Sequence, residues 1–232
     1  MKTYRLYPSL FDAYVYMTEA EDEEQLAERK QALLDSLNRI EGVPSEAMAR
    51  GTVLNAIVDA VVTKSMDYDL PTYFGSHEGF DFLFDGELVR KLADRFAYSL
   101  CQTFTSANIL TSKGLVKLYG YPDYVCGDIV FDLKTTASYT FGKYRNKWQS
   151  KVYPYCLVMS EAVQTVTEFQ YIVAEVGKPN AQGVITGEVY KESYYYTFGE
   201  CSDAIRSFLE EDLLPFIEDN RSAITNNQIF NI

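Results

Sequence analysis

The spacing of hydrophobic residues predicts helices in the first hundred positions of the chain. An acidic run at 19–24 suits a helix N-terminus. It leads into apolar positions at helical spacing, which are Leu26, Leu33, Leu34, Leu37 and Ile40. Gly42 and Pro44 are expected to end this helix, and Ser45 to cap a second one, whose apolar positions are Leu54, Ile57, Val58 and Val61. A third helix is predicted from residues spaced by four: Phe84, Leu88, Leu92 and Phe96.

After position 103 the pattern changes to short strands. Breaks at 112–114 and 120–122 divide the stretch 103–135 into a hairpin that leads into further strands. A helix is predicted over 143–160, strands over 165–176 and 184–198, and a final helix over 202–217. No internal repeat is found, so we expect one α/β domain with helices flanking a mixed sheet. Its expected parts are a helical region (18–103), a sheet and helix that carry the candidate chemistry (104–160), and C-terminal strands with a helix (164–218).

Two aspartates and a lysine are expected to meet on this sheet. Residues alternate along 128–134, so Asp132 and Lys134 point to one face of a strand. Asp123 is expected on the preceding strand, where it can pair across. Carboxylate oxygens are the ligands that Mg²⁺ prefers, and the backbone carbonyl of Leu133 is an acceptable third ligand. Lys134 can orient a metal-bound water or accept its proton, provided that burial and the cation lower its pKa. These residue types predict metal-dependent hydrolysis of a phosphodiester, with one or two Mg²⁺ or Mn²⁺ ions.

Four motifs occur in a fixed order along the chain. They are the helix 50–59 with Asn55 and Asp59, then Gly120-x-x-Asp123, Asp132-Leu133-Lys134-Thr135-Thr136 and Gln149-x-x-x-Tyr153. This order resembles the PD-(D/E)XK nuclease superfamily, and more closely its RecB-like branch, which includes phage exonucleases and CRISPR-associated nucleases. Asn55 stands where that branch has histidine, and Asp59 where it has glutamate. Residues four apart share a helix face, so both can point at the metal pocket.

The resemblance implies a restriction-endonuclease-like α/β/α core and a DNA nuclease. The implied metal ligands are Asp123, Asp132, Leu133, Asp59 and Asn55. Gln149 and Tyr153 would organise the catalytic Lys134 and contact the nucleic-acid strand, and Thr135 and Thr136 would contact a phosphate. The implied partners are linear duplex DNA or single-stranded ends, together with a recombinase, an annealing protein or a second copy of the chain.

The charge of the chain is unusual for a protein that binds nucleic acid. The net charge is −12, whereas affinity for phosphates normally comes from lysine and arginine. Between residues 106 and 151, however, seven basic residues face three acids. A cluster of Lys143, Arg145, Lys147 and Lys151 flanks Gln149. We therefore expect a local groove for a nucleic-acid strand, against the alternative of an ordinary solvated helix face.

Other classes of site and protein are not favoured by the sequence. Cys101, Cys126, Cys156 and Cys201 are widely spaced, so free thiols are expected and no iron–sulfur cluster. His77 is the sole histidine, which excludes a multi-histidine metal site. No apolar stretch approaches the ~18 residues of a membrane span, and no signal peptide is seen, so a cytoplasmic protein without membrane contact is expected.

The sequence thus favours a magnesium-dependent DNA nuclease, an exonuclease of phage or mobile-element type in recombination or repair. A second hypothesis is a nuclease-fold protein with weak or lost catalysis that binds nucleic acid or a protein partner, because Asn55 replaces histidine and the whole chain is acidic. A third is a nuclease for RNA or for particular structures, since nothing in the motifs recognises a 2′-hydroxyl.

Overall fold

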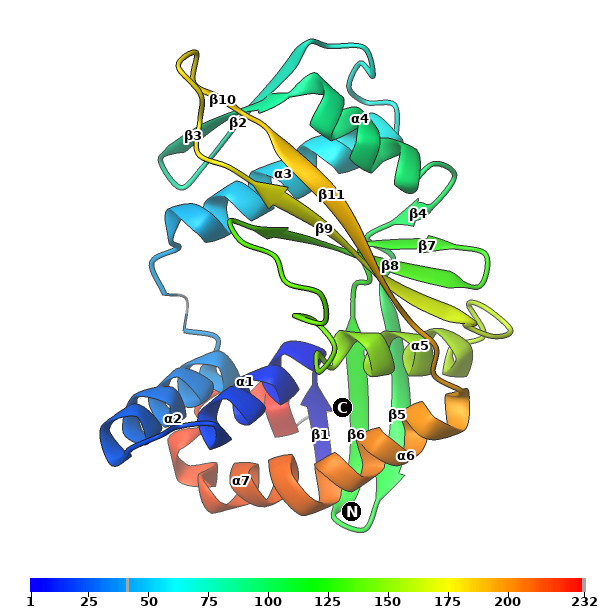
Figure 1. Ribbon diagram of the computed structural model, residues 1–232. Coiled ribbons are helices and arrows are strands. Elements are labelled where there is room, and N and C mark those ends of the chain that lie inside the picture. The colour runs from blue at the N-terminus through cyan, green and yellow to red at the C-terminus, as the bar shows by residue number, and fades with distance from the viewer. Residues whose placement is uncertain (41, 231–232) are drawn as a thin grey trace.

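The computed structural model describes residues 1–40 and 42–230 (Figure 1). The α-helices are α1 (Pro8–Thr18), α2 (Glu23–Asn38), α3 (Glu46–Val62), α4 (Gly86–Arg95), α5 (Gln149–Met159), α6 (Phe198–Phe208) and α7 (Leu214–Asp219). A π-helical turn (Leu209–Leu213) joins α6 to α7, and 3₁₀ turns follow at Arg221–Ala223 and Asn227–Phe230. The strands are β1 (Thr3–Leu6), β2 (Thr72–His77), β3 (Phe80–Asp85), β4 (Leu100–Cys101), β5 (Thr105–Thr111), β6 (Gly114–Gly120), β7 (Tyr124–Cys126), β8 (Ile129–Thr136), β9 (Glu168–Val176), β10 (Val184–Ile185) and β11 (Gly187–Tyr194). The predicted mixed α/β class is confirmed.

The central sheet has five strands in the order β11-β9-β8-β7-β4. β8 and β9 are parallel, with Asp132 opposite Tyr171, and the other pairs are antiparallel. Because side chains alternate along a strand, β8 contributes to two hydrophobic clusters. Phe131 and Leu133 pack with α3 and α4 on one face, whereas Val130 packs with α5 on the other. Helices therefore cover both faces of the sheet, as expected.

A second sheet, β1-β6-β5, lies outside the central one. The hairpin β5–β6, which we predicted to share a sheet with the metal-binding strands, instead pairs with β1 and packs with α1, α2, α5 and α6 in a separate hydrophobic cluster. Figure 1 shows α3 and α4 at one end of the molecule, α1, α2, α6 and α7 at the other, and α5 between them. A third sheet, β10-β3-β2, flanks α3.

Several predicted elements agree with the structure. Ser45 caps α3 through a hydrogen bond from Met48 N to its Oγ, at 3.3 Å. Asp22 caps α2 in the same way, because its Oδ1 accepts from Gln25 N at 2.8 Å. The two C-terminal strands form the antiparallel pair β9–β11.

Other predictions were wrong. The third helix begins at Gly86, because Phe84 belongs to β3 and Asp85 caps α4 with bonds from the amides of Glu87 and Leu88. The helix predicted over 143–160 begins only at Gln149, since the preceding residues form turns. The final helix starts at Phe198 and contains a π turn. The sequence did not indicate β1, α1 or the β2–β3 hairpin.

The candidate active site

Asp132 and Lys134 form an ion pair on the α5 side of the central sheet. Lys134 Nζ lies 2.6 Å from Asp132 Oδ2. The Asp132 residue is only 1% exposed, so its charge is balanced within the protein rather than by water. The alternation predicted along β8 is confirmed, because it directs both side chains to one face.

Asp123 joins this pair from the turn before β7. It was expected within a strand, but β7 begins one residue later. Its Oδ2 accepts a hydrogen bond from the backbone amide of Leu133, at 2.8 Å. This bond fastens the turn against the middle of the Asp132-Leu133-Lys134 triplet, so the two aspartates and the lysine occupy one cluster.

Gln102 is a member of the cluster that sequence reasoning missed. Its Nε2 donates to Asp123 Oδ1 at 3.3 Å, and its backbone amide donates to the Asp123 carbonyl at 2.9 Å. Its side chain also hydrogen-bonds Asp59. The φ of Gln102 is 47°, in the left-handed region that is uncommon for residues other than glycine. No motif surrounds this residue, so nothing in the sequence could have singled it out.

Helix α5 brings the glutamine and tyrosine of the last motif to the lysine. Lys134 Nζ donates to Gln149 Oε1 at 2.7 Å. Tyr153 lies one turn further on, nearly buried, and packs against Gly120. A Cβ at position 120 would lie 2.6 Å from Tyr153 Cε1. Glycine therefore allows the ring to approach the backbone closely.

The electrostatics of the cluster are those of a site with excess negative charge. Burial, and next the charge of Asp132, raise the pKa of Asp123 to about 7. Burial also raises the pKa of Asp132, although Lys134 opposes the shift. Burial lowers the pKa of Lys134, but Asp132 and Asp123 outweigh it, and the net pKa lies above its ordinary value. The lowered lysine pKa expected from the sequence depends on a nearby cation, and the side chains alone produce the opposite shift.

The two expected metal ligands on α3 differ in their contacts. The hydroxyl of Tyr124 donates to Asp59 Oδ1, and the Gln102 side chain links Asp59 to Asp123. Asn55 Oδ1 is buried without a hydrogen-bond partner. Among residues 1–40 and 42–230, no three histidine, cysteine, aspartate or glutamate side chains are grouped so that they could hold a metal ion. Asp123 and Asp132 are the carboxylates that act most strongly on Lys134.

The expected strand-binding residues lie on and beside the connection between β8 and α5. Lys143 Nζ donates to Thr136 Oγ1 at 2.7 Å and to the Ser138 carbonyl at 2.8 Å. Thr135 is half-buried beside Gly51 of α3. Arg145 is exposed, and Lys147 is half-buried.

Lys151, by contrast, is held among aromatic rings. Its Nζ lies 5.3 Å from the ring centroid of Trp148 and 4.8 Å from that of Tyr196. Burial lowers the pKa of Lys151. The ammonium therefore interacts with two π faces, whereas Lys143, Arg145 and Lys147 are carried by the connection itself.

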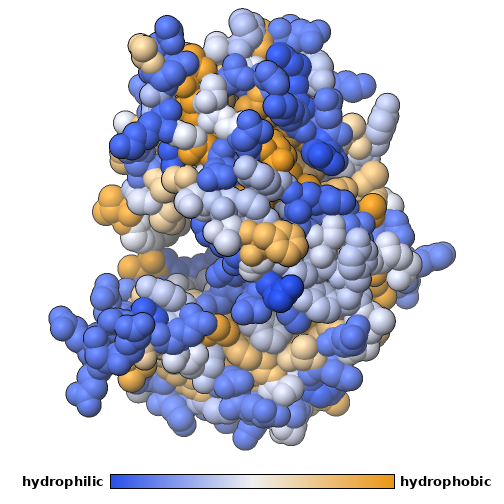
Figure 2. Space-filling view, in the orientation of Figure 1, coloured by the Kyte–Doolittle hydropathy of each residue, from blue (hydrophilic) through white to orange (hydrophobic). Residues whose placement is uncertain are grey.

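Two hollows are relevant to the position of the site. A groove of about 210 Å³ lies between α1 and the β8–α5 connection, and it is lined by Asp12, Val15, Tyr16, Glu19, Lys143, Asn146 and Lys147. Figure 2 shows a mostly hydrophilic face that is hollowed between the two ends of the molecule.

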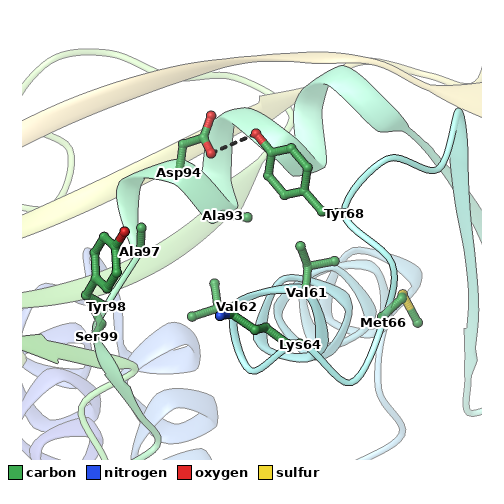
Figure 3. A pocket seen from close by; sticks show the side chains of 10 residues that line it. All are labelled: Val61, Val62, Lys64, Met66, Tyr68, Ala93, Asp94, Ala97, Tyr98 and Ser99. Atoms are coloured by element: carbon green, nitrogen blue, oxygen red, sulfur yellow. Dashed lines mark hydrogen bonds between the residues drawn. The ribbon is translucent and has the colours of Figure 1, made fainter.

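A cavity of about 500 Å³ lies between the C-terminal ends of α3 and α4 (Figure 3). Its walls are mainly apolar and aromatic, and they include Val61, Val62, Ala97 and Tyr98. None of the residues predicted from the motifs lines it. We therefore place the candidate active site at the carboxylate–lysine cluster.

Comparisons with known proteins add little to this geometry. No family model and no curated protein match the chain. A solved structure, the crystal structure of SSO0001, is similar over 90% of this chain and 77% of its own, with 12% sequence identity and a TM-score of 0.42. A similarity this low says nothing about the chemistry of the cluster.

Among the described residues, no helix is both long and apolar enough to cross a membrane. The four cysteines form no disulfide, and Cys156 and Cys201 are buried.

Proposed function

We propose that this chain is a metal-dependent deoxyribonuclease, an exonuclease of the RecB-like kind that hydrolyses phosphodiester bonds at DNA ends in recombination or repair. The observation that carries the proposal is the convergence of Asp123, Asp132, Lys134 and Gln149 from three separate segments of the chain. A buried ion pair contributes little net stability compared with apolar packing. Its presence in the middle of a sheet therefore supports a chemical role.

Asp123 and Asp132 would hold a hard divalent cation, Mg²⁺ or Mn²⁺. Two carboxylates face one lysine, and burial together with the charge of Asp132 raises the pKa of Asp123. A bound cation would compensate this negative charge. Further oxygen donors of the right kind are the Leu133 carbonyl and Asn55 Oδ1, which is buried without a partner. Asp59 would support the site through Gln102. The cation, when bound, acidifies water and neutralises charge on the phosphate.

Lys134 would orient the attacking water and stabilise negative charge on the phosphate. Gln149 fixes the position of Nζ by accepting its hydrogen bond. Tyr153 packs one turn away on the same helix and supports that arrangement. These three residues would act as a unit, and the loss of any one would leave the lysine less well placed.

The substrate strand would follow the β8–α5 connection. Lys143 and Lys147 line the groove beside α1, and Arg145 is exposed next to them. Cations on one connection supply the phosphate affinity that the acidic chain otherwise lacks. Thr136 is held by Lys143 and lies at the end of the strand that carries the catalytic pair.

The decisive test is digestion of end-labelled linear and closed circular DNA, with and without Mn²⁺. We expect metal-dependent loss of linear DNA and a loss of at least ~100-fold in rate for Lys134→Ala. Cleavage of circles would identify an endonuclease, and cleavage of RNA in parallel would redefine the substrate. Equal digestion by Lys134→Ala would refute the proposal, because the activity would then come from a contaminant.

A second candidate is a nuclease-fold protein that binds nucleic acid or a protein without hydrolysing it. It is favoured by the bond between Tyr124 and Asp59, which occupies an expected metal ligand, and by Asn55 in place of histidine. Calorimetric titration with Mg²⁺ and Mn²⁺ separates the two candidates. Heat of binding that disappears in Asp123→Ala supports the enzyme, and no binding at millimolar metal supports the inactive scaffold.

A further inference from the structure

Asp12 reaches the candidate site from a distant part of the chain. It lies on α1, yet its Oδ1 accepts a hydrogen bond from the backbone amide of Trp148, 136 residues later, at 3.1 Å. No sequence motif includes Asp12. The bond joins the hydrophobic cluster around α1 to the start of the helix that carries Gln149 and Tyr153.

Helix α5 lacks the features that usually stabilise a helix start. Its N-cap residue, Trp148, makes no side-chain capping bond, and its first turn contains no acidic residue. The first amides of a helix have no partner within the helix, and the positive end of the helix dipole favours a negative charge. Asp12 supplies both an acceptor and a negative charge from α1.

Aromatic packing also supports the contact between α1 and the start of α5. The rings of Phe11 and Trp148 lie 5.2 Å apart, and those of Trp148 and Phe208 lie 4.5 Å apart. Gln149 is the next residue, and its Oε1 lies 2.7 Å from Lys134 Nζ. A shift of the Trp148 backbone would therefore move Gln149 relative to Lys134.

The charge of Asp12 also acts on the lysines of the site. It attracts Lys147 and, more weakly, Lys134. With Lys143 and Lys147 it lines the groove beside α1. Asp12 is thus close to the cluster without being part of the carboxylate pair on β8 and the β7 turn.

We propose that Asp12 is a positioning residue, which holds the start of α5 so that Gln149 meets Lys134. This inference rests on the proposed function for its catalytic consequence. Its structural consequence can be measured without any nuclease activity.

The test compares Asp12→Ala, which removes the acceptor, with Asp12→Asn, which keeps one. Asp22→Ala is the matched control, because Asp22 caps α2 with an equivalent bond to Gln25 N. In metal-free protein, amide hydrogen exchange at Trp148 should be at least ~10-fold faster in Asp12→Ala, within ~3-fold of wild type in Asp12→Asn, and unchanged in Asp22→Ala.

Acylation of the Lys134 amine, followed by mass spectrometry, reports the contact with Gln149. Labelling should be several-fold faster in Asp12→Ala than in wild type, Asp12→Asn or Asp22→Ala. With linear DNA and Mn²⁺, Asp12→Ala should lower kcat by ~10- to 100-fold and change KM by less than ~3-fold, since the basic connection remains. Asp12→Asn should restore kcat to within ~3-fold of wild type.

Equal exchange at Trp148 in wild type and Asp12→Ala would overturn the inference, as would unchanged Lys134 labelling or an Asp12→Asn enzyme as poor as Asp12→Ala. A wild-type protein that cleaves nothing would refute the proposed function instead. In that case exchange and labelling would still decide whether Asp12 places Gln149 on Lys134.

Discussion

At the scale of single residues, two buried carboxylates serve different purposes. Glu192 is 1% exposed and accepts hydrogen bonds from Tyr139, Gly142 and Tyr194. Its donors are neutral and fixed, so it fastens one part of the chain to another. Asp132 is equally buried, but it faces a lysine and a second aspartate. Two buried carboxylates beside a single lysine destabilise the folded protein unless a cation compensates their negative charge.

A stability cost at Asp123 follows from its raised pKa. The folded value is about 7, whereas an unfolded aspartate titrates near ~4. Below pH ~4 Asp123 is protonated in both the folded and the unfolded protein, so the metal-free fold keeps its full stability. As the pH rises from ~4 to ~7, Asp123 ionises in the unfolded protein but stays protonated in the folded one, and the fold loses stability. Asp123→Asn does not ionise, so it should be more stable than wild type by up to ~4 kcal/mol at pH 8, which is about three pKa units at ~1.4 kcal/mol each, with no advantage at pH 4.

Thermal unfolding in EDTA at both pH values measures this difference. Asp81→Asn, at an exposed aspartate on β3, is the control and should change stability little at either pH. Saturating Mn²⁺ should stabilise wild type more than Asp123→Asn, because the ion binds the folded carboxylates. A variant less stable than wild type at pH 8 in EDTA would contradict the electrostatic account of the cluster.

The residues that the sequence could identify are those set by local spacing. Asp132 and Lys134 were placed correctly because alternation along a strand is a local rule. Gln102 and Asp12 act through turns and helices that are distant in sequence, and neither lies in a recognisable pattern. Asp59 shares a helix face with Asn55 as expected, but Tyr124 engages it from the sheet. Such partners are decided by tertiary packing, which one sequence does not reveal.

At the scale of elements, the approach of β6 to α5 depends on one glycine. A Cβ at position 120 would lie 2.6 Å from Tyr153 Cε1. Gly120→Ala should therefore displace the ring and destabilise the protein by ~1 to 3 kcal/mol, as overpacked substitutions do. Chemical denaturation measures this loss. Gly199→Ala, near the start of α6 with its nearest neighbour at 4.0 Å, should be neutral or slightly stabilising, and equal effects of the two changes would argue against the close approach.

The β8–α5 connection is fastened by Glu192. Gly142 N donates to Glu192 Oε1 at 2.9 Å, and the Tyr139 hydroxyl donates at 2.8 Å. Glu192→Ala should cost ~2 kcal/mol, because buried donors lose their acceptor. Proteolysis within 137–148 and exchange at Gly142 should both accelerate. Glu188→Ala, at an exposed glutamate on the same strand, should change neither, and an unaltered connection in Glu192→Ala would show that other contacts hold it.

The same contacts explain why the element boundaries were predicted only in part. Residues 143–148 have a composition compatible with helix, but Glu192 and Asp12 hold turns there until Gln149. Phe80, Phe82 and Phe84 stack along β3, so period two prevails over the spacing of four that suggested a helix. β1 has four residues and pairs with β6, from Thr3 opposite Leu115 onwards. A strand this short, which is stabilised by a partner distant in sequence, shows almost no pattern of hydrophobic residues by which it could be predicted.

At the scale of the whole molecule, an acidic chain carries a small group of basic residues, Lys143, Arg145 and Lys147, on the β8–α5 connection. The net charge is −12, so long-range electrostatics oppose binding of nucleic acid. The hydrophobic clusters around α1 and α3 lie on either side of the site, and α5 contributes to both the first cluster and the sheet face. Binding should therefore depend on a few cations at this junction rather than on the general charge of the surface.

Salt dependence tests this distribution of charge. Each phosphate contact lowers the slope of log K against log[salt] by ~0.9 for duplex DNA. If Lys143 and Arg145 each neutralise a phosphate, the double variant Lys143→Ala, Arg145→Ala should bind DNA with a slope shallower by about 2, measured in EDTA so that no cleavage occurs. Lys178→Ala removes an exposed charge from the remote β9–β10 turn, and its slope should equal that of wild type. Because each lysine or arginine that neutralises a phosphate releases counterions from the DNA, equal slopes for all three proteins would mean that the strand does not follow this connection, even if the carboxylate cluster is catalytic.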